Sequence, residues 1–179
     1  MLQVNALMVF LVLVAVVVVF GFVIVQKMDE RRWQRYQFER DMFFRSHPLV
    51  IEDTTEFSYQ LKISYAAQRK IITEQMLKPT AQPYHKKVRL QRVPESQHEK
   101  YMIDVMLKDI KIGQLDYIYA QQLGQYLEKT DFKVGRPIEV LSEILVIQKS
   151  EYELGCQIRL NLPADSAEIE YLEVKEQSK

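Results

Sequence analysis

The first part of the chain is an unbroken apolar segment, and the later part alternates between apolar and polar positions. Residues Ala6–Val25 read ALMVFLVLVAVVVVFGFVIV, twenty residues without a charged side chain. As an α-helix this segment would be about 30 Å long, which matches the hydrocarbon thickness of a bilayer. A buried core helix would be shorter or carry a polar stripe, and a cleaved signal peptide would begin with basic residues and end at small ones. The pattern therefore predicts a transmembrane anchor within residues 1–26.

The flanks of this segment predict its orientation in the membrane. The leading segment MLQVN has no charged side chain, whereas the residues after the span include the basic residues Lys27, Arg31, Arg32, Arg35 and Arg40. The positive-inside rule therefore places the C-terminal part in the cytoplasm. We expect a single-pass protein of the inner (cell) membrane, with its N terminus outside and a cytoplasmic C-terminal domain.

Residues 27–55 are predicted to form a juxtamembrane helix and a linker. No Gly or Pro occurs from Asp29 to Ser46, which favours a helix. This helix should stop near His47-Pro48, because a residue before proline avoids the helical region. Leu49–Glu56 has the composition of a short acidic linker.

Beyond this linker, the pattern predicts one α+β domain over residues 56–163. From Phe57 to Tyr65, apolar and polar residues alternate, which is the signature of a half-buried strand. The further predicted elements are a helix over Ala66–Leu77, strands over Val88–Arg92, Tyr101–Leu107 and Lys111–Leu115, a helix over Ile118–Leu127, and strands over Ile138–Gln148 and Tyr152–Leu162. The last two strands can pair as a hairpin through Lys149-Ser150. This order indicates a small, strongly curved sheet or barrel with two helices covering its ends.

Charge is balanced over the whole chain and uneven along it. Lys plus Arg and Asp plus Glu are both 24. Between Lys62 and Arg92 there are eight basic residues and one acid, Glu74, whereas residues 164–179 form an acidic tail that we expect to be solvated and partly frayed. The basic segment fits an anionic ligand whose affinity falls with salt. It also fits a set of basic side chains that only solvate a helix, a loop and an edge strand.

Enzymatic chemistry and bound cofactors are not predicted. The single cysteine, Cys156, excludes an intramolecular disulfide and lies in a predicted strand, where we expect a buried structural thiol. The histidines His47, His85 and His98 lack partners at metal-ligand spacing, and the five glycines form no phosphate-binding loop. We therefore expect a binding protein without catalytic residues, metal or cofactor.

Short motifs between Ile63 and Leu162 carry a resemblance to a known family. They are Ile63-Ser64-Tyr65 followed by Gln68-Arg69-Lys70, Val88-Arg89-Leu90-Gln91-Arg92-Val93-Pro94, Met102-Ile103-Asp104-Val105, Ile112-Gly113-Gln114-Leu115, and Gly155–Leu162. Together they resemble the HIRAN domain, a small module found alone in bacteria and fused to helicase-type chromatin remodellers in eukaryotes. The chain departs from the family pattern at Lys62, where a glycine is common, and at Glu95, Ser96 and Glu99, where the family usually has Asn-x-x-Asp. The resemblance implies an OB- or SH3-like β-barrel with two helices.

The resemblance also implies that the domain binds the free end of single-stranded DNA. Such a site needs aromatic faces for bases, cations for phosphates and a polar group for the end hydroxyl. The candidate residues are Tyr65 as the stacking ring, Glu99 as a hydrogen-bond acceptor, the cations Arg69 and Arg92, and Gln114 and Tyr117. The expected partners are the lipid bilayer and single-stranded DNA or another anionic ligand. The alternative is an adaptor that recruits a protein partner to the membrane and has no nucleic-acid role.

Overall fold

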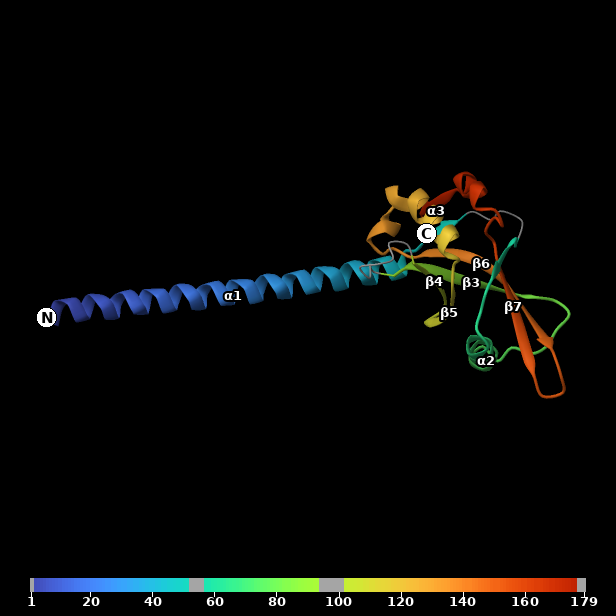
Figure 1. The fold of residues 1–179 in the computed structure, drawn as a ribbon, viewed down its shortest axis with the longest axis horizontal. Coiled ribbons are helices and arrows are strands. Elements are labelled where there is room, and N and C mark those ends of the chain that lie inside the picture. The colour runs from blue at the N-terminus through green and yellow to red at the C-terminus, as the bar shows by residue number, and fades with distance from the viewer. Residues whose placement is uncertain (1, 52–56, 94–101, 177–179) are drawn as a thin grey trace. The chain divides into compact units, whose positions relative to one another are not determined.

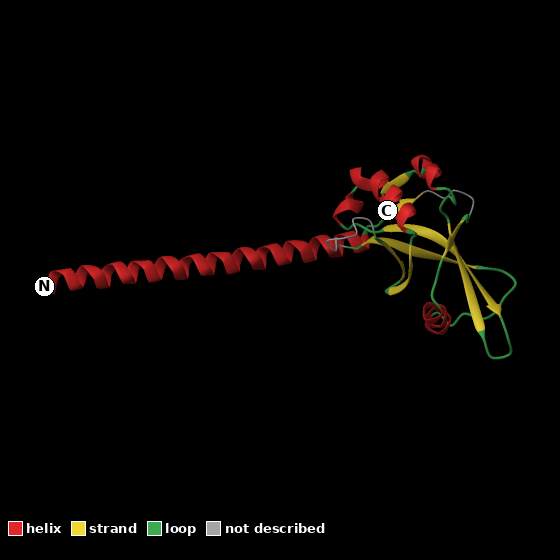
Figure 2. Ribbon diagram, viewed as in Figure 1, coloured by secondary structure: helices red, strands yellow, loops and turns green. Residues whose placement is uncertain are grey.

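The computed structural model describes residues 2–51, 57–93 and 102–176, with the side chains of all of these except residues 2–13, 15 and 133. The chain divides into two compact units, Met1–Phe43 and Phe44–Lys179. Figure 1 shows the order of the elements along the chain, and Figure 2 shows which of them are helices and strands.

The first unit is formed by helix α1 (Leu2–Ser46), whose last turn, from Phe44, belongs to the second unit. The helix ends directly before His47-Pro48, which confirms the predicted helix end. Trp33 and Tyr36, one turn apart and both exposed, stack with their ring centroids 5.8 Å apart. Among the residues whose side chains are described, no helix is both long and apolar enough to cross a membrane. The predicted span Ala6–Val25 lies partly outside those residues, because it includes residues 6–13 and 15.

The second unit is built on a curled, mostly antiparallel sheet that forms a half-barrel (Figure 2). In the described part of the chain its strands are β1 (Leu49–Ile51), β2 (Tyr59–Leu61), β3 (Tyr84–Arg92), β4 (Ile103–Leu107), β5 (Ile110–Gln114), β6 (Ile138–Gln148), β7 (Leu154–Leu160) and β8 (Val174–Glu176). The strand order is β2-β7-β6-β3-β4-β5, and β1 pairs in parallel with β6 and antiparallel with β8. The predicted α+β class and curved sheet are thereby confirmed, as is the hairpin, in which Val146 of β6 faces Cys156 of β7.

Helices lie between the strands in the order that the sequence predicts. Helix α2 (Tyr65–Glu74) follows β2, and helix α3 (Tyr117–Tyr126) follows β5. The described residues of this unit also form three short 3₁₀ helices: η1 (Leu127–Lys129), η2 (Asp131–Val134) and η3 (Ser166–Tyr171). Each predicted helix is therefore confirmed to within a few residues at its ends.

The buried apolar residues of the described part of this unit form one cluster against the sheet. Along β6, buried positions alternate with half-buried ones from Ile138 to Ile147, so that one face of the strand is in the core. Ile71 of α2 and Leu123 of α3 are fully buried in the same cluster. Both helices are therefore attached to the sheet by their apolar faces.

The edge strands β2 and β5 approach each other where the sheet curls around. A Cβ atom added to Gly113 in β5 would lie 3.2 Å from the side chain of Leu61 and from the carbonyl oxygen of Lys62. A larger residue at this position would push against backbone, which cannot move aside as a flexible side chain can. The glycine therefore permits the approach of the two edges, and the side chain of Lys62 also reaches Asp116 just beyond β5, with Nζ and Oδ1 3.1 Å apart.

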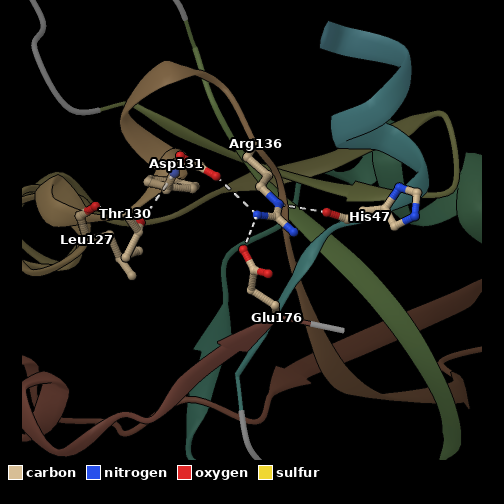
Figure 3. A network of polar contacts seen from close by, with 7 residues as sticks. His47, Leu127, Thr130, Asp131, Arg136 and Glu176 are labelled. Atoms are coloured by element: carbon tan, nitrogen blue, oxygen red, sulfur yellow. Dashed lines mark hydrogen bonds and ion pairs between the residues drawn. The ribbon is translucent and has the colours of Figure 1, made fainter. Parts of the chain in front are cut away.

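A buried arginine joins three distant segments of the second unit (Figure 3). The Arg136 side chain is 5% exposed, and its Nε donates to the carbonyl oxygen of His47 at 2.7 Å. Its Nη1 contacts Asp131 at 3.1 Å and Glu176 at 2.8 Å. Thr130 begins η2 by accepting a hydrogen bond from the backbone N–H of Phe132, which places Asp131 in the first turn. The backbone at His47, η2 and β8 are thus held by one guanidinium.

Two predictions at the start of the domain, a strand boundary and a linker, are wrong. The predicted strand Phe57–Tyr65 is shorter, because the Ser64 hydroxyl accepts a hydrogen bond from the N–H of Ala67 and so begins α2 at Tyr65. The predicted linker contains a strand, β1, which pairs with β6 and β8.

The expectation of a frayed acidic tail is also wrong for the described residues after Pro163. Asp165 caps η3 by accepting from Ala167, and Ile169 and Leu172 are buried in the core. Strand β8 then pairs with β1. Apolar residues spaced through an acidic segment are enough to fold it onto the sheet. The candidate Glu99, together with Glu95 and Ser96, lies outside the described residues.

Candidate functional site

Helix α2 carries two of the candidate residues on one side. Tyr65 is its first residue, and Arg69 follows four residues later, so the two side chains are neighbours on the helix surface. The helix is fixed against β7, because the side-chain oxygen of Gln68 accepts a hydrogen bond from the backbone N–H of Cys156 at 3.3 Å. Ile71 anchors the opposite side of the helix in the core.

Tyr65 and Arg69 line a pocket together with a residue from a distant part of the chain. The pocket has a volume of about 310 Å³ and is lined by Tyr65, Arg69, Ile72, Thr73, Tyr152 and Leu154. Tyr152 lies in the turn of the β6–β7 hairpin and is 92% exposed, and Tyr65 is 52% exposed. We call this space the α2 pocket. It brings two exposed aromatic rings and a guanidinium into one concave surface.

Arg69 differs from most of its basic neighbours in having no acidic partner among the described residues. Lys70 pairs with Glu74 at 3.7 Å, and Lys62 pairs with Asp116 at 3.1 Å. The carboxylate of Glu139 on β6 receives two further basic residues, Lys87 at 3.5 Å and Arg89 at 3.4 Å. Two acids from outside the basic segment, Asp116 and Glu139, therefore pair with three of its eight basic side chains. The charge at Arg69 is available to an anion.

The other described candidate residues do not meet in this pocket. The side-chain nitrogen of Gln114 donates to Asp104 at 2.7 Å, and Asp104 also pairs with Lys111 at 2.9 Å, so the amide of Gln114 is engaged. Tyr117 begins α3 and lines a separate pocket beside Asp116. A phosphate at that position would face a carboxylate.

Arg92 and Gln114 lie on opposite faces of the sheet. Arg92 is paired across the strands with Ile103, which is buried in the core, whereas Gln114 is paired with Asp104. Residues paired directly across two strands point to the same face, and neighbours along one strand point to opposite faces. Since Ile103 and Asp104 are neighbours, Arg92 and Gln114 point to opposite faces. Tyr65 and Arg69 are therefore the described candidates that the fold brings together, and Glu99 lies outside the described residues.

The fold adds one residue to the site that the sequence analysis missed. Tyr152 stands in a hairpin turn between Glu151 and Glu153. Its position beside α2 depends on how the hairpin packs. A large aromatic residue at an exposed turn is the only local signal that marks it.

Other chemistry in the described part of the chain is limited. No group of three or more His, Cys, Asp or Glu side chains there is arranged to hold a metal ion. Cys156 is buried as predicted, and burial raises the pKa of its thiol to about 11. The thiol is therefore protonated at neutral pH, which is unfavourable for a nucleophile.

Comparison of the chain with protein-family models, with curated proteins and with solved structures gives no match in any of the three.

Proposed function

We propose that the chain is a membrane-tethered, non-enzymatic binding module that binds the end of a single-stranded nucleic acid in the α2 pocket. The observation that carries this proposal is the convergence of Tyr65, Arg69 and Tyr152 on one concave surface. Stacking of a base on an aromatic side chain contributes about 1–3 kcal/mol and does not depend on base identity. A guanidinium binds phosphate oxygens through two parallel hydrogen bonds.

The shape of the pocket favours an unpaired base over a duplex. A volume of about 310 Å³ is at the lower end of the range for small-ligand sites. A base inside a duplex has its faces covered by its neighbours, whereas a terminal or unpaired base can enter between two rings. The resemblance to the HIRAN domain supports the same ligand. Both Tyr65 and Arg69 belong to the first of the motifs that carry this resemblance.

The membrane tether in this proposal is supported by the sequence. Ala6–Val25 is apolar throughout and long enough for a bilayer, and basic residues follow it at once. The proposed orientation places the N terminus outside and the second unit on the cytoplasmic side of the inner membrane. There the α2 pocket would meet nucleic acid and other cytoplasmic anions.

The ligand is tested by titrating the full chain, in detergent micelles, into fluorescently labelled single-stranded oligonucleotides at low salt and following anisotropy. The full chain is used so that β1 and the His47 carbonyl, which belong to the folded unit, are both present. We expect Tyr65→Ala, Tyr152→Ala and Arg69→Gln each to weaken binding by about tenfold. Tyr171→Ala is the matched control, because this tyrosine is 83% exposed on η3 and lies outside the pocket.

Capture of an end is tested by competition with a circular single strand of the same length and composition. The proposal predicts that the circle competes much less well than the linear strand. Equal competition would mean that the protein binds single strands without recognising a free end. Absence of any binding at low salt would contradict the proposal and favour the protein adaptor.

The tether is tested by carbonate extraction of membranes and by a reporter fused after Lys179. We expect the protein to stay in the membrane pellet and the reporter to be active in the cytoplasm. Release by carbonate, or a reporter that is active outside the cell, would overturn the proposed anchor and orientation.

A further inference from the structure

A second pocket lies where α3 and η3 pack together, beside β2. Its volume is about 750 Å³, and it is lined by Tyr59, Asp116, Tyr117, Ile118, Tyr119, Ala164, Asp165 and Ser166. We call it the α3 pocket. Its residues belong to β2, to the start of α3 and to the segment around η3, so it exists only in the folded unit.

The walls of the α3 pocket are mainly aromatic and aliphatic. The rings of Tyr59 and Tyr119 lie in contact, with centroids 4.5 Å apart, and both are buried. Tyr117 and Ile118 are 59% and 67% exposed, although they are large and apolar. Side chains of this size are usually covered, and an exposed pair beside a hollow is typical of a contact surface.

The charges in the α3 pocket are negative. Its lining includes the carboxylates of Asp116 and Asp165 and contains no basic side chain. Burial raises the pKa of Tyr119, with smaller contributions from Tyr59 and from the negative charge of Glu168. A cation would therefore find both carboxylate oxygens and ring faces in this pocket, whereas a phosphate would be repelled.

Asp116 does not serve the usual structural purpose of its position. It stands at the N-cap of α3, yet its carboxylate makes no capping hydrogen bond. The carboxylate instead contacts the hydroxyl of Tyr59 at 3.4 Å and the ammonium group of Lys62 at 3.1 Å. The Lys62 side chain is 82% exposed and reaches the rim from outside the lining. The Asp116 carboxylate is therefore already paired with a cation, the ammonium group of Lys62.

We propose that the α3 pocket docks a basic segment of a partner polypeptide, by receiving an arginine or lysine side chain of that segment. The aliphatic stem of the incoming side chain lies along Tyr117 and Ile118, as long basic side chains do on apolar surface. Its charged end replaces Lys62 at Asp116 and approaches Asp165. The negative charge of the pocket and its apolar walls are both complementary to such a side chain.

This site is independent of the α2 pocket. The α2 pocket offers a cation and rings to an anion, and the α3 pocket offers anions and rings to a cation. One chain would then hold an anionic ligand and a basic protein partner at the membrane at the same time. Either proposal can fail without the other.

The test uses the full chain in detergent micelles and a labelled peptide in which arginines alternate with leucines. The matched probe is the same peptide with citrulline in place of each arginine, which keeps the shape and removes the charge. We expect the arginine peptide to bind about tenfold more tightly than the citrulline peptide. Asp116→Asn and Asp165→Asn should each weaken binding of the arginine peptide severalfold, and asparagine at 165 can still cap η3.

Lys62→Gln provides a result that a folding defect cannot imitate. Removing the competing ammonium group should tighten binding of the arginine peptide. Glu170→Gln, on η3 but outside the pocket, controls for general negative charge and should have little effect. Arg69→Gln should leave peptide binding unchanged, which separates this test from that of the α2 pocket. Equal binding of the two peptides, or weaker binding by Lys62→Gln, would overturn the proposal.

Discussion

Arg136 shows how a single residue holds segments that are far apart in the sequence. Its guanidinium is buried, while its acidic partners Asp131 and Glu176 are 55% and 76% exposed. A buried charge is tolerated only when it is paired and hydrogen-bonded. Here the third partner, the carbonyl of His47, is a backbone group that would be left without this donor if the arginine were removed.

Arg136→Ala should lower the free energy of unfolding by about 2–4 kcal/mol, because it removes a buried guanidinium that makes three hydrogen bonds and leaves a cavity. Glu176→Gln is the matched control and should cost less than about 1 kcal/mol, since the Glu176 side chain is 76% exposed, glutamine can still accept a hydrogen bond and Asp131 still pairs with the guanidinium. Urea denaturation followed by circular dichroism measures both. Equal stability of Arg136→Ala and the wild type would show that the network does not hold the unit together.

The buried thiol of Cys156 provides a test at the level of one ionisable group. Burial raises its pKa from 9.0 to about 11. Since the thiolate is the reactive form, alkylation by iodoacetamide at pH 8.5 should be about a hundredfold slower in the folded protein than in urea. The native rate should keep rising to about pH 11, whereas the rate of a thiol with a pKa of 9.0 levels off above about pH 10. A native rate close to the denatured one at pH 8.5 would contradict the burial of this residue.

At the scale of the elements, local patterns predicted helices α2 and α3 and strand β6 well, whereas β3 begins at Tyr84, before the predicted Val88. The alternation along β6 and the spacing in α2 and α3 are local properties, and these elements appear where the sequence predicts them. The strand predicted over Phe57–Tyr65 failed at its end, because the hydroxyl of Ser64 caps a helix and interrupts an alternation that continues in the sequence.

The short strands β1 and β8 could not be predicted from local patterns. Leu49 pairs with Ile138 on one side and with Glu176 on the other, and neither partner is near it in the sequence. Three-residue strands carry too little alternation to be recognised. The acidic composition of the C-terminal segment suggested solvation and concealed the apolar residues Ile169 and Leu172 that fold it onto the core.

Truncation after Glu173 tests whether this C-terminal segment is part of the fold. Loss of β8 removes the antiparallel partner of β1 and the Glu176 contact of Arg136, so the midpoint of urea denaturation should fall. Truncation after Glu176 keeps β8 and should leave the midpoint nearly unchanged. An equal midpoint for both truncated proteins would mean that the tail is not required for stability.

At the scale of the whole molecule, charge is paired across segments that the sequence keeps apart. Three of the eight basic residues in Lys62–Arg92, namely Lys62, Lys87 and Arg89, pair with Asp116 just beyond β5 and with Glu139 of β6. Counting charges along the chain therefore overestimated the positive surface. Arg69 is a candidate ligand contact because it lines a pocket with Tyr65 and Tyr152, and not because the surface has a general excess of cations.

The sequence predicted only those parts of the candidate site whose residues are close together in the chain. Tyr65 and Arg69 are one helical turn apart, so the sequence placed them together. Arg92 and Gln114 were separated by the strand register, and Tyr152 was added by the packing of a hairpin. Register and packing depend on contacts between distant residues, which a single sequence does not show.

The central claim, that Arg69 contacts a phosphate of a single-stranded ligand held between Tyr65 and Tyr152, is tested most directly by the salt dependence of binding. For single strands, the slope of log K against log salt changes by about 0.7 for each phosphate contact. Arg69→Gln should make the slope shallower by about this amount, whereas Lys70→Gln, on the same helix and paired with Glu74, should leave it unchanged. The same slope for the wild type and Arg69→Gln would contradict the account.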